Sequence, residues 1–214
     1  NVGATAGRGL RGQLMFYKVD GLTITGIETT TIGAQQFFIH IAEVTDVILR
    51  DIDAEGTKDG IHLGVANNVL MEDIRTCTID DGIAINAADY YTSNPTVGEI
   101  KNITVRRWED DYKEGQGGSG MLLLSGSWAG WTTATDYQLN DICVNGGNVY
   151  QKTNVGIDTS SVAPTHTSGS VTGADGITWV WIQAGTITNS EINNVLIENA
   201  VWKSNRYLVR AVPN

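Results

Sequence analysis

The sequence predicts an all-β fold, a right-handed parallel β-helix in which short strands stack coil upon coil, interrupted by a small inserted β module. Two observations predict this stack: apolar and other residues alternate within short segments, and similar segments return at near-equal intervals. Hydrophobic residues make up 41% of the 214 residues, which is enough to fill a core. A generic all-β domain is the alternative that these patterns leave open.

One set of segments begins with Asn, Asp or Gly before an apolar alternation. Alternation with a period of two and β-branched enrichment indicates a strand with one buried face. The five segments are Asp20–Ile27, Asp46–Ile52, Asn68–Ile74, Asn102–Trp108 and Asn194–Ala200. We expect Asn68, Asn102 and Asn194 to form a ladder of turn residues.

A second set of strands follows the first. Its members are Phe38–Ile41, Gly60–Leu63, Gly82–Ile85, Gly120–Leu124 and Tyr207–Arg210. The intervals from Ile39 to Ile61 and from Ile61 to Ile83 are both 22 residues. Equal intervals indicate in-register strands stacked about 4.8 Å apart, and loops absorb the wider interval of 38 residues from Ile83 to Met121.

The repeat stops between residues 126 and 188. The chain therefore divides into β-helix coils at 1–125, an inserted module at 126–188 and a final coil at 189–214. Within the insert, Asn145–Asn148 predicts a hairpin turn that follows a strand at Asp136–Val144, and Thr178–Ile182 predicts the last of three strands.

The insert holds four of the six tryptophans, Trp128, Trp131, Trp179 and Trp181, together with Tyr150. Flat aromatic faces stack on the apolar faces of sugar rings, so these five residues are candidates for substrate binding. The alternative is that a small domain uses its tryptophans to fill its core. The segment resembles the small chitin- and cellulose-binding modules that also recur in phage tail proteins.

The charge of the chain excludes some partners. A net charge of -10 and a pI of about 4.6 repel nucleic acids and anionic membranes. We find no run of 18 apolar residues, so membrane insertion is not predicted. Cys77 and Cys143 are expected to be buried free thiols, and neither a metal nor a cofactor is predicted.

Three aspartates are the candidate catalytic residues. Asp59 and Asp81 occupy the same point of consecutive coils, 22 residues apart and each before Gly-Ile, and Asp80 adjoins them. Crowded carboxylates repel, which raises at least one pKa and separates an acid from a base. Inverting glycoside hydrolases need such a pair about 6.5–9.5 Å apart. The alternative is ordinary Asp-Gly turn chemistry.

These motifs resemble the polygalacturonase family of glycoside hydrolases, within the pectin-lyase-like β-helices. The matching segments are Arg11–Phe16, Phe38–His40, Thr57–Ile61 and Asp80–Ile85. The resemblance runs from Arg11 to Asn86, and it implies that Asp80 is the general acid while Asp59 and Asp81 activate the water.

The sequence departs from the family pattern at two places. The family's Gly-His-Gly reads Gly118–Gly120, with serine at the centre, and its Arg-x-Lys sugar clamp has only an imperfect counterpart in Arg206 and Arg210. His62, expected to project outward on the rung of the first aspartate, is the candidate to replace the missing histidine. His40 lies one rung below it.

The function predicted is a hydrolase that cuts a surface or capsular polysaccharide as part of a phage tail spike, which implies an extracellular or virion location. The first alternative is a non-catalytic glycan-binding adhesin that uses the same β-helix as a rigid scaffold. The second is a purely structural fibre. Because a short stack leaves strand edges open, we expect a homotrimer or a place within a larger fibre.

Overall fold

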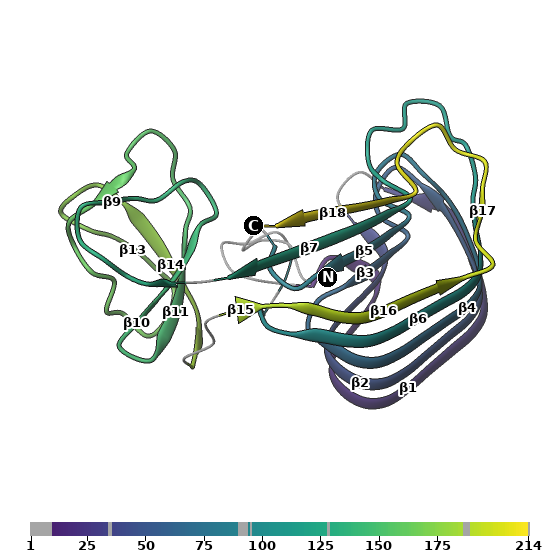
Figure 1. Cartoon of the computed structure of the whole chain (residues 1–214), viewed down its shortest axis with the longest axis horizontal. Coiled ribbons are helices and arrows are strands. Elements are labelled where there is room, and N and C mark those ends of the chain that lie inside the picture. The colour runs from purple at the N-terminus through teal and green to yellow at the C-terminus, as the bar shows by residue number, and fades with distance from the viewer. Residues whose placement is uncertain are drawn as a thin grey trace.

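The structure is a computed structural model that describes residues 10–33, 36–89, 94, 96–127, 129–185 and 189–213. The described chain is all β: one large, strongly curled sheet lies beside smaller sheets formed by the inserted segment (Figure 1). Among these residues no helix is long and apolar enough to cross a lipid bilayer.

Ten strands build the curled sheet, and all their described pairings are parallel. They are β1 (Gly12–Ile32), β2 (Phe37–Gly56), β3 (Ile61–Leu63), β4 (Ala66–Thr78), β5 (Ile83–Asn86), β6 (Ile100–Asp110), β7 (Met121–Ser127), β16 (Ile192–Glu198), β17 (Val201–Trp202) and β18 (Val209–Pro213). The short strand β15 (Asn189–Ser190) pairs antiparallel with the end of β7, where the chain leaves and re-enters this sheet.

The register of the curled sheet confirms the predicted repeat. One column of paired residues runs through Ile39, Ile61, Ile83, Met121 and Val209. A second column runs through Leu22, Val47, Val69, Ile103 and Val195. The wide intervals in the sequence are therefore loops between stacked strands, and they leave the stacking intact.

Each turn of the chain bends at single residues in the left-handed region. The first such corner holds Gly21, Asp46, Asn68, Asn102 and Asn194, with φ values of 74°, 53°, 55°, 57° and 56°. Gly, Asn and Asp tolerate this conformation best, which explains why they precede each apolar alternation.

The side chains of this corner form the predicted asparagine ladder. Asn68 Nδ2 donates to Asp46 Oδ1 at 2.9 Å, Asn102 Nδ2 to Asn68 Oδ1 at 3.0 Å, and Asn194 Nδ2 to Asn102 Oδ1 at 2.8 Å. Each amide thus links two neighbouring turns of the chain.

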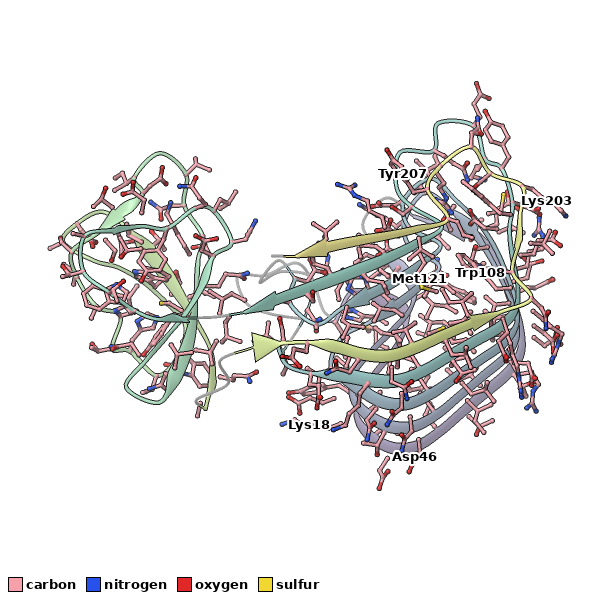
Figure 2. The ribbon with its side chains drawn as sticks, in the orientation of Figure 1. Lys18, Asp46, Trp108, Met121, Lys203 and Tyr207 are labelled. Carbon is pink, nitrogen blue, oxygen red and sulfur yellow. The ribbon has the colours of Figure 1, made fainter. Side chains whose placement is uncertain are left out.

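The inside of the curl is the main hydrophobic core. Trp108 and Met121 point inward, whereas Lys18, Asp46 and Lys203 lie on the outside (Figure 2). Alternate residues of each strand enter this core, which keeps a polar surface on the outer face.

The inserted segment forms its own sheets. Its strands are β8 (Ala129–Gly130), β9 (Thr135–Asp136), β10 (Ile142–Asn145), β11 (Asn148–Lys152), β12 (Thr159–Ser160), β13 (Ser170–Thr172) and β14 (Thr178–Ala184). Five of them pair in the order β13-β14-β11-β10-β8, and β9 pairs with β12. The insert therefore holds more strands than the three that the sequence predicts.

The predicted hairpin is confirmed, but the strand before it is shorter than expected. Gly146 and Gly147 both have positive φ, as a tight turn between β10 and β11 requires. The expected strand Asp136–Val144 is interrupted because the chain turns at Asn140, whose φ is 74°. Cys77 and Cys143 are buried and free, as predicted.

The insert packs against the segment that precedes β6. Ala88 and Val97 share an apolar cluster with residues of β10, β11 and β14. The side chain of Gln183 also accepts from the backbone N–H of Val97 at 3.4 Å and donates to its carbonyl at 3.2 Å. The insert therefore contacts the part of the chain that forms the curled sheet through packing and hydrogen bonds, in addition to its covalent connections.

We predict that Asn102→Ala lowers the free energy of unfolding by about 2–3 kcal/mol. Alanine loses the hydrogen bonds of the ladder and pays the steric cost of a left-handed backbone. Asn102→Gly adopts the left-handed backbone without strain and should therefore lower the free energy of unfolding by less. Urea denaturation measures both variants, and equal losses in the two would contradict the backbone part of this argument.

Candidate functional site

The candidate site lies where the turns before β3, β5, β7 and β18 stack on one another. Backbone hydrogen bonds continue the register through this corner: Gly60 N donates to Asp81 O, Gly82 N to Ser119 O, and Gly120 N to Tyr207 O, at 3.1, 3.0 and 2.7 Å. Asp59, Asp81, Ser119 and Tyr207 therefore form one column across four rungs.

The glycines of these turns are required by the close approach of the rungs. A Cβ atom on Gly60 would lie 2.7 Å from the carbonyl oxygen of Gly82, and one on Gly82 would lie 2.7 Å from that of Gly120. The close stacking therefore explains the glycine of each Asp-Gly pair, but it does not explain the aspartate.

The three predicted aspartates do come together. Oxygen atoms of Asp59, Asp80 and Asp81 lie within 4.8 Å of one another. This is closer than the 6.5–9.5 Å expected of an inverting pair, so the expected spacing is corrected; two carboxylate oxygens this close can share one hydrogen-bonded water. The same oxygens are close enough to hold a cation, but the ammonium group of Lys58 already lies 2.5 Å from Asp80 Oδ2.

The pKa of Asp81 lies near neutral pH. Its side chain is buried, and its Oδ1 accepts a hydrogen bond from the backbone N–H of Ser119 at 2.6 Å. Burial, and then the charge of Asp59, raise the pKa of Asp81 to about 7 in spite of that bond.

His62 lies between two buried carboxylates. Its Nδ1 is 2.7 Å from Asp59 Oδ2 and its Nε2 is 3.1 Å from Asp89 Oδ2. Burial opposes protonation, but the hydrogen bonds to Asp59 and Asp89 prevail and raise the pKa of His62 to about 9. The ring is therefore an imidazolium at neutral pH, hydrogen-bonded to Asp59 through Nδ1 and ion-paired with Asp89 through Nε2. Burial also raises the pKa of Asp59, and the bond to His62 opposes that shift.

The position of His62 corrects the expectation that it projects outward toward a substrate. The side chain is 1% exposed, and the ring of Phe37 stacks on it at 4.1 Å between centroids. His62 therefore positions the carboxyl group of Asp59 from the side that faces away from the solvent. His40 is also buried, and its Nδ1 accepts from the backbone N–H of Arg11; burial lowers its pKa to about 2, so it is neutral.

The residue that sequence reasoning missed is Asp89, the second partner of His62. It follows β5 in a segment without a repeat, and its only signal is the short spacing from Asn86, whose Nδ2 donates to Asp89 Oδ2 at 3.0 Å. Gln151 of the insert donates to the carbonyl oxygen of Asp89 at 3.1 Å. The insert thus contacts the segment that carries a site residue.

A pocket of about 450 Å³ opens over these groups. The three aspartates and Lys58 line it together with Leu122 and Leu124 of β7 and Arg210 of β18. Register places Arg210 in the column of His62, and its side chain is exposed. Of the two predicted clamp arginines, Arg210 is the one that the structure brings to the aspartates.

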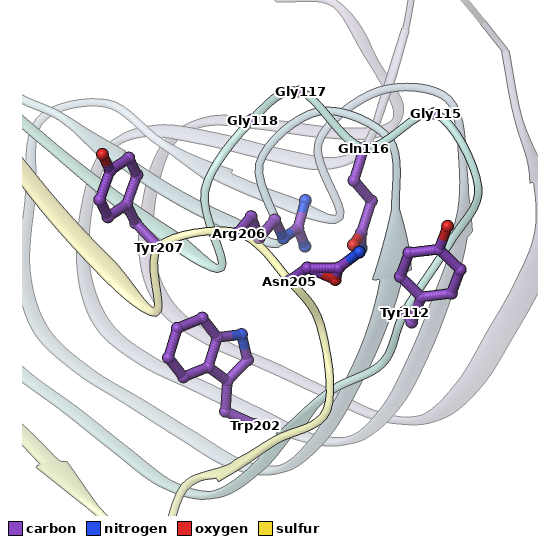
Figure 3. Close-up of a pocket in the computed structure, with 9 residues that line it drawn as sticks. All are labelled: Tyr112, Gly115, Gln116, Gly117, Gly118, Trp202, Asn205, Arg206 and Tyr207. Atoms are coloured by element: carbon purple, nitrogen blue, oxygen red, sulfur yellow. The ribbon is translucent and has the colours of Figure 1, made fainter.

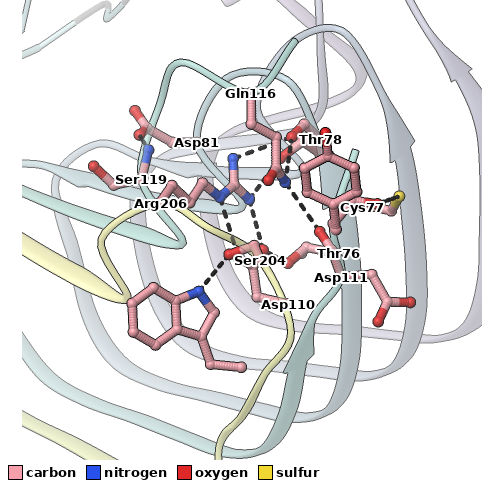
Figure 4. Close-up of polar contacts among 12 residues, drawn as sticks. Thr76, Cys77, Thr78, Asp81, Asp110, Asp111, Gln116, Ser119, Ser204 and Arg206 are labelled. Carbon is pink, nitrogen blue, oxygen red and sulfur yellow. Dashed lines mark hydrogen bonds and ion pairs between the residues drawn. The ribbon is translucent and has the colours of Figure 1, made fainter. Parts of the chain in front are cut away.

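Arg206, the other predicted clamp residue, is buried and hydrogen-bonded within the protein. Its guanidinium bonds Asp110 Oδ1 and Oδ2 at 2.6 and 3.1 Å and the Thr78 carbonyl at 3.1 Å (Figure 4). It also bonds the carbonyl of Asp80. Its side chain is 4% exposed, so the assignment to sugar binding is corrected to a structural one. Arg206 holds the backbone at the aspartate turn.

The aromatic residues of the insert also divide into buried and partly exposed groups. Tyr150 and Trp179 are buried in the core of the insert and are not available to stack on a sugar, because this small module has few other large side chains to bury. Trp131 and Trp181 are half-buried, and their indole N–H groups bond Ser160 and Asn148 at 2.9 Å. Trp128 lies outside the described residues.

We predict that Asp81→Asn stabilises the fold at pH 8 by about 1–3 kcal/mol and less at pH 4.5. A carboxyl whose pKa rises on folding, here to about 7, contributes stability below its unfolded pKa and loses it as the pH rises through 7. Asparagine can still accept from Ser119 and carries no charge. Urea denaturation at both pH values measures the difference, with Asp20→Asn as the control; equal effects at the two pH values would contradict the buried-charge argument.

Comparisons with known proteins leave the family of this chain open. No protein-family model, curated protein or solved structure matches it. The case for a function therefore depends on the fold and on the chemistry of the pocket.

Proposed function

We propose that the curled sheet is a short right-handed parallel β-helix and that the protein is an inverting, polygalacturonase-like glycoside hydrolase. The observation that carries this proposal is the convergence of Asp59, Asp80 and Asp81 beside an open pocket. The stacked register supports the β-helix, because residues one repeat apart pair directly in both strand columns.

The three carboxyl groups have different surroundings, which suit different roles. The side chain of Asp80 is 35% exposed, the most accessible of the three, so it is the group that a glycosidic oxygen reaches first. Asp59 and Asp81 are buried and hold the attacking water between them. A base whose pKa lies near neutral pH is well matched to this task, and Asp81 meets that requirement.

The reaction follows from these roles. The water attacks the anomeric carbon and passes its proton to Asp81, while the bond from that carbon to the leaving oxygen breaks. Asp80 gives the leaving oxygen a proton that it takes from the Lys58 ammonium, which donates to its Oδ2 at 2.5 Å. The imidazolium of His62 opposes the rise in the pKa of Asp59 that burial causes, and its hydrogen bond holds that carboxyl group in place beside the water.

The substrate class is a surface or capsular polysaccharide that contains acidic sugars. Four aspartates line the pocket, where Lys58 is paired with Asp80 and His62 with Asp59, so the cation left for an acidic sugar is the exposed Arg210, in a protein whose net charge is -10. An exposed guanidinium pairs well with a uronate carboxylate, so a local positive charge can bind an anionic sugar although the net charge of the protein is negative.

The setting that fits this function is a phage tail spike outside the cell, with the insert as a glycan-binding module and further copies arranged around the stack. The alternative is an adhesin that binds glycan without cutting it. The observation in its favour is that Trp131 and Trp181 remain partly exposed on the insert.

We predict that Asp59→Asn and Asp81→Asn each lower the release of reducing ends from a susceptible polysaccharide by about 10²–10⁴-fold. The probes are de-esterified pectin and a panel of purified bacterial capsular polysaccharides. Asp20→Asn should retain full activity, circular dichroism should show the same fold in all variants, and EDTA should have no effect.

Activity within tenfold of the parent in both variants would rule out the proposed site. If the parent releases no reducing ends but binds a glycan, and Trp181→Ala abolishes that binding, the adhesin is the correct function.

The pH dependence tests the role of Asp81. A base with a pKa of about 7 is ionised above that pH and protonated below it, so activity should fall as the pH drops through 7. The measurement is kcat/KM between pH 5 and 9. Activity that instead falls as the pH rises through 7 would make Asp81 the general acid.

A further inference from the structure

A second pocket lies at the same corner of the curled sheet, beside the turns that carry the aspartates. It has a volume of about 600 Å³ and lies between the loop that precedes β7 and the loop that precedes β18 (Figure 3). Three aromatic side chains line it, namely Tyr112 of the first loop, Trp202 at the end of β17 and Tyr207 of the second loop. Neither the repeat nor the acid–base chemistry of the neighbouring pocket requires aromatic residues here.

These aromatic side chains are unusually exposed. Tyr207 is 71% exposed, Tyr112 is 53% exposed and Trp202 is 46% exposed. Large apolar rings gathered around a hollow that also contains polar groups, here Gln116 and Asn205, mark a binding site more often than a flat contact surface. The combination of ring faces with amide groups suits a sugar, which offers an apolar face and a rim of hydroxyls.

The floor of this pocket is the back of the aspartate turn. Gly117 and Gly118 donate to the carbonyl oxygen of Ile79 at 3.0 and 3.2 Å, and a Cβ atom on Gly118 would lie 2.5 Å from the carbonyl carbon of Asp80. Arg206, beneath the pocket, bonds the carbonyl of Asp80. Residues that line the second pocket therefore contact the backbone of the aspartate turn.

The register also aligns the two pockets along the stack. Tyr207 stands in the column of Asp59 and Asp81, two rungs beyond Asp81. At about 4.8 Å per rung this places its backbone roughly 10 Å farther along the stack, a distance that a short oligosaccharide spans. A polymer lying along the column would meet the aspartates first and Tyr207 next.

We propose that Tyr112, Trp202 and Tyr207 form an auxiliary subsite that binds the polysaccharide by ring stacking, away from the cleavage point. The identity of the ligand as a glycan rests on the proposed function. The subsite holds the chain while the aspartates act on it, so it should affect the KM for long polymers and leave the turnover of short oligosaccharides unchanged.

The test uses the full chain carrying Asp81→Asn, so that binding is measured without cleavage. The probes are de-esterified pectin and the same panel of capsular polysaccharides, in affinity electrophoresis. Adding Trp202→Ala and Tyr207→Ala together should weaken binding at least about tenfold. Trp202→Phe should retain most of the affinity, and Tyr17→Ala, which removes an exposed tyrosine of β1, should change nothing.

The outcomes separate this subsite from the hydrolase. In the otherwise unaltered chain, Trp202→Ala with Tyr207→Ala should raise the KM for polymer and leave kcat on short oligosaccharides unchanged. Unchanged affinity and KM would overturn the subsite and leave the hydrolase standing. Loss of binding in a protein that never releases reducing ends would support the subsite and overturn the hydrolase.

A further outcome would assign these aromatic residues to another role. If sedimentation shows that Trp202→Ala converts an oligomer into a monomer without weakening glycan binding, the pocket is an interface between copies of the chain, and the subsite is overturned. Failure of the Asp81→Asn protein to bind any of the probes would also count against it.

Discussion

The parallel register of the backbone is the constraint on which the rest of the structure depends. Because Gly60 N bonds Asp81 O and Gly82 N bonds Ser119 O, residues far apart in sequence occupy successive rungs of one column. A column places like side chains about 4.8 Å apart whether or not their charges favour it. The crowding of Asp59 with Asp81 is therefore imposed by hydrogen bonds that the whole sheet stabilises.

The buried charge that follows from this crowding has a cost, and the structure offsets it with specific partners. His62 gives Asp59 a positive neighbour, and the Ser119 N–H group gives Asp81 a donor. A buried ion pair of this kind does not usually increase stability over an apolar core. Its persistence in a pocket open to solvent is the physical reason to assign it to chemistry, since the close-packed glycines alone would satisfy the turn.

The parts of the fold that depend on local pattern could be predicted from the sequence, and those that depend on packing could not. Alternation and the recurring turn residues predict the strands and the asparagine ladder, and the 22-residue interval predicts that Asp59 stacks on Asp81, because each leaves a recurring local pattern. Asp89 reaches His62 only through the path of an irregular segment, and Arg206 is buried only because Asp110 lies opposite it. Neither relation leaves a periodic signal.

The same distinction explains why aromatic composition was a poor guide to the residues available for binding, whereas the exposure of each side chain identifies them. Tryptophans concentrate in the insert, yet Trp179 fills its core, as a module with little other apolar volume requires. Trp202 and Tyr207 carry no motif, but Trp202 at the end of β17 and Tyr207 in the following loop lie outside the apolar core, and their rings stay exposed. A loop lengthened on a regular scaffold thus supplies binding surface without disturbing the register that positions the aspartates. The aromatic residues of the proposed subsite thus belong to the wide intervals between strands, whereas the proposed catalytic aspartates belong to the repeat.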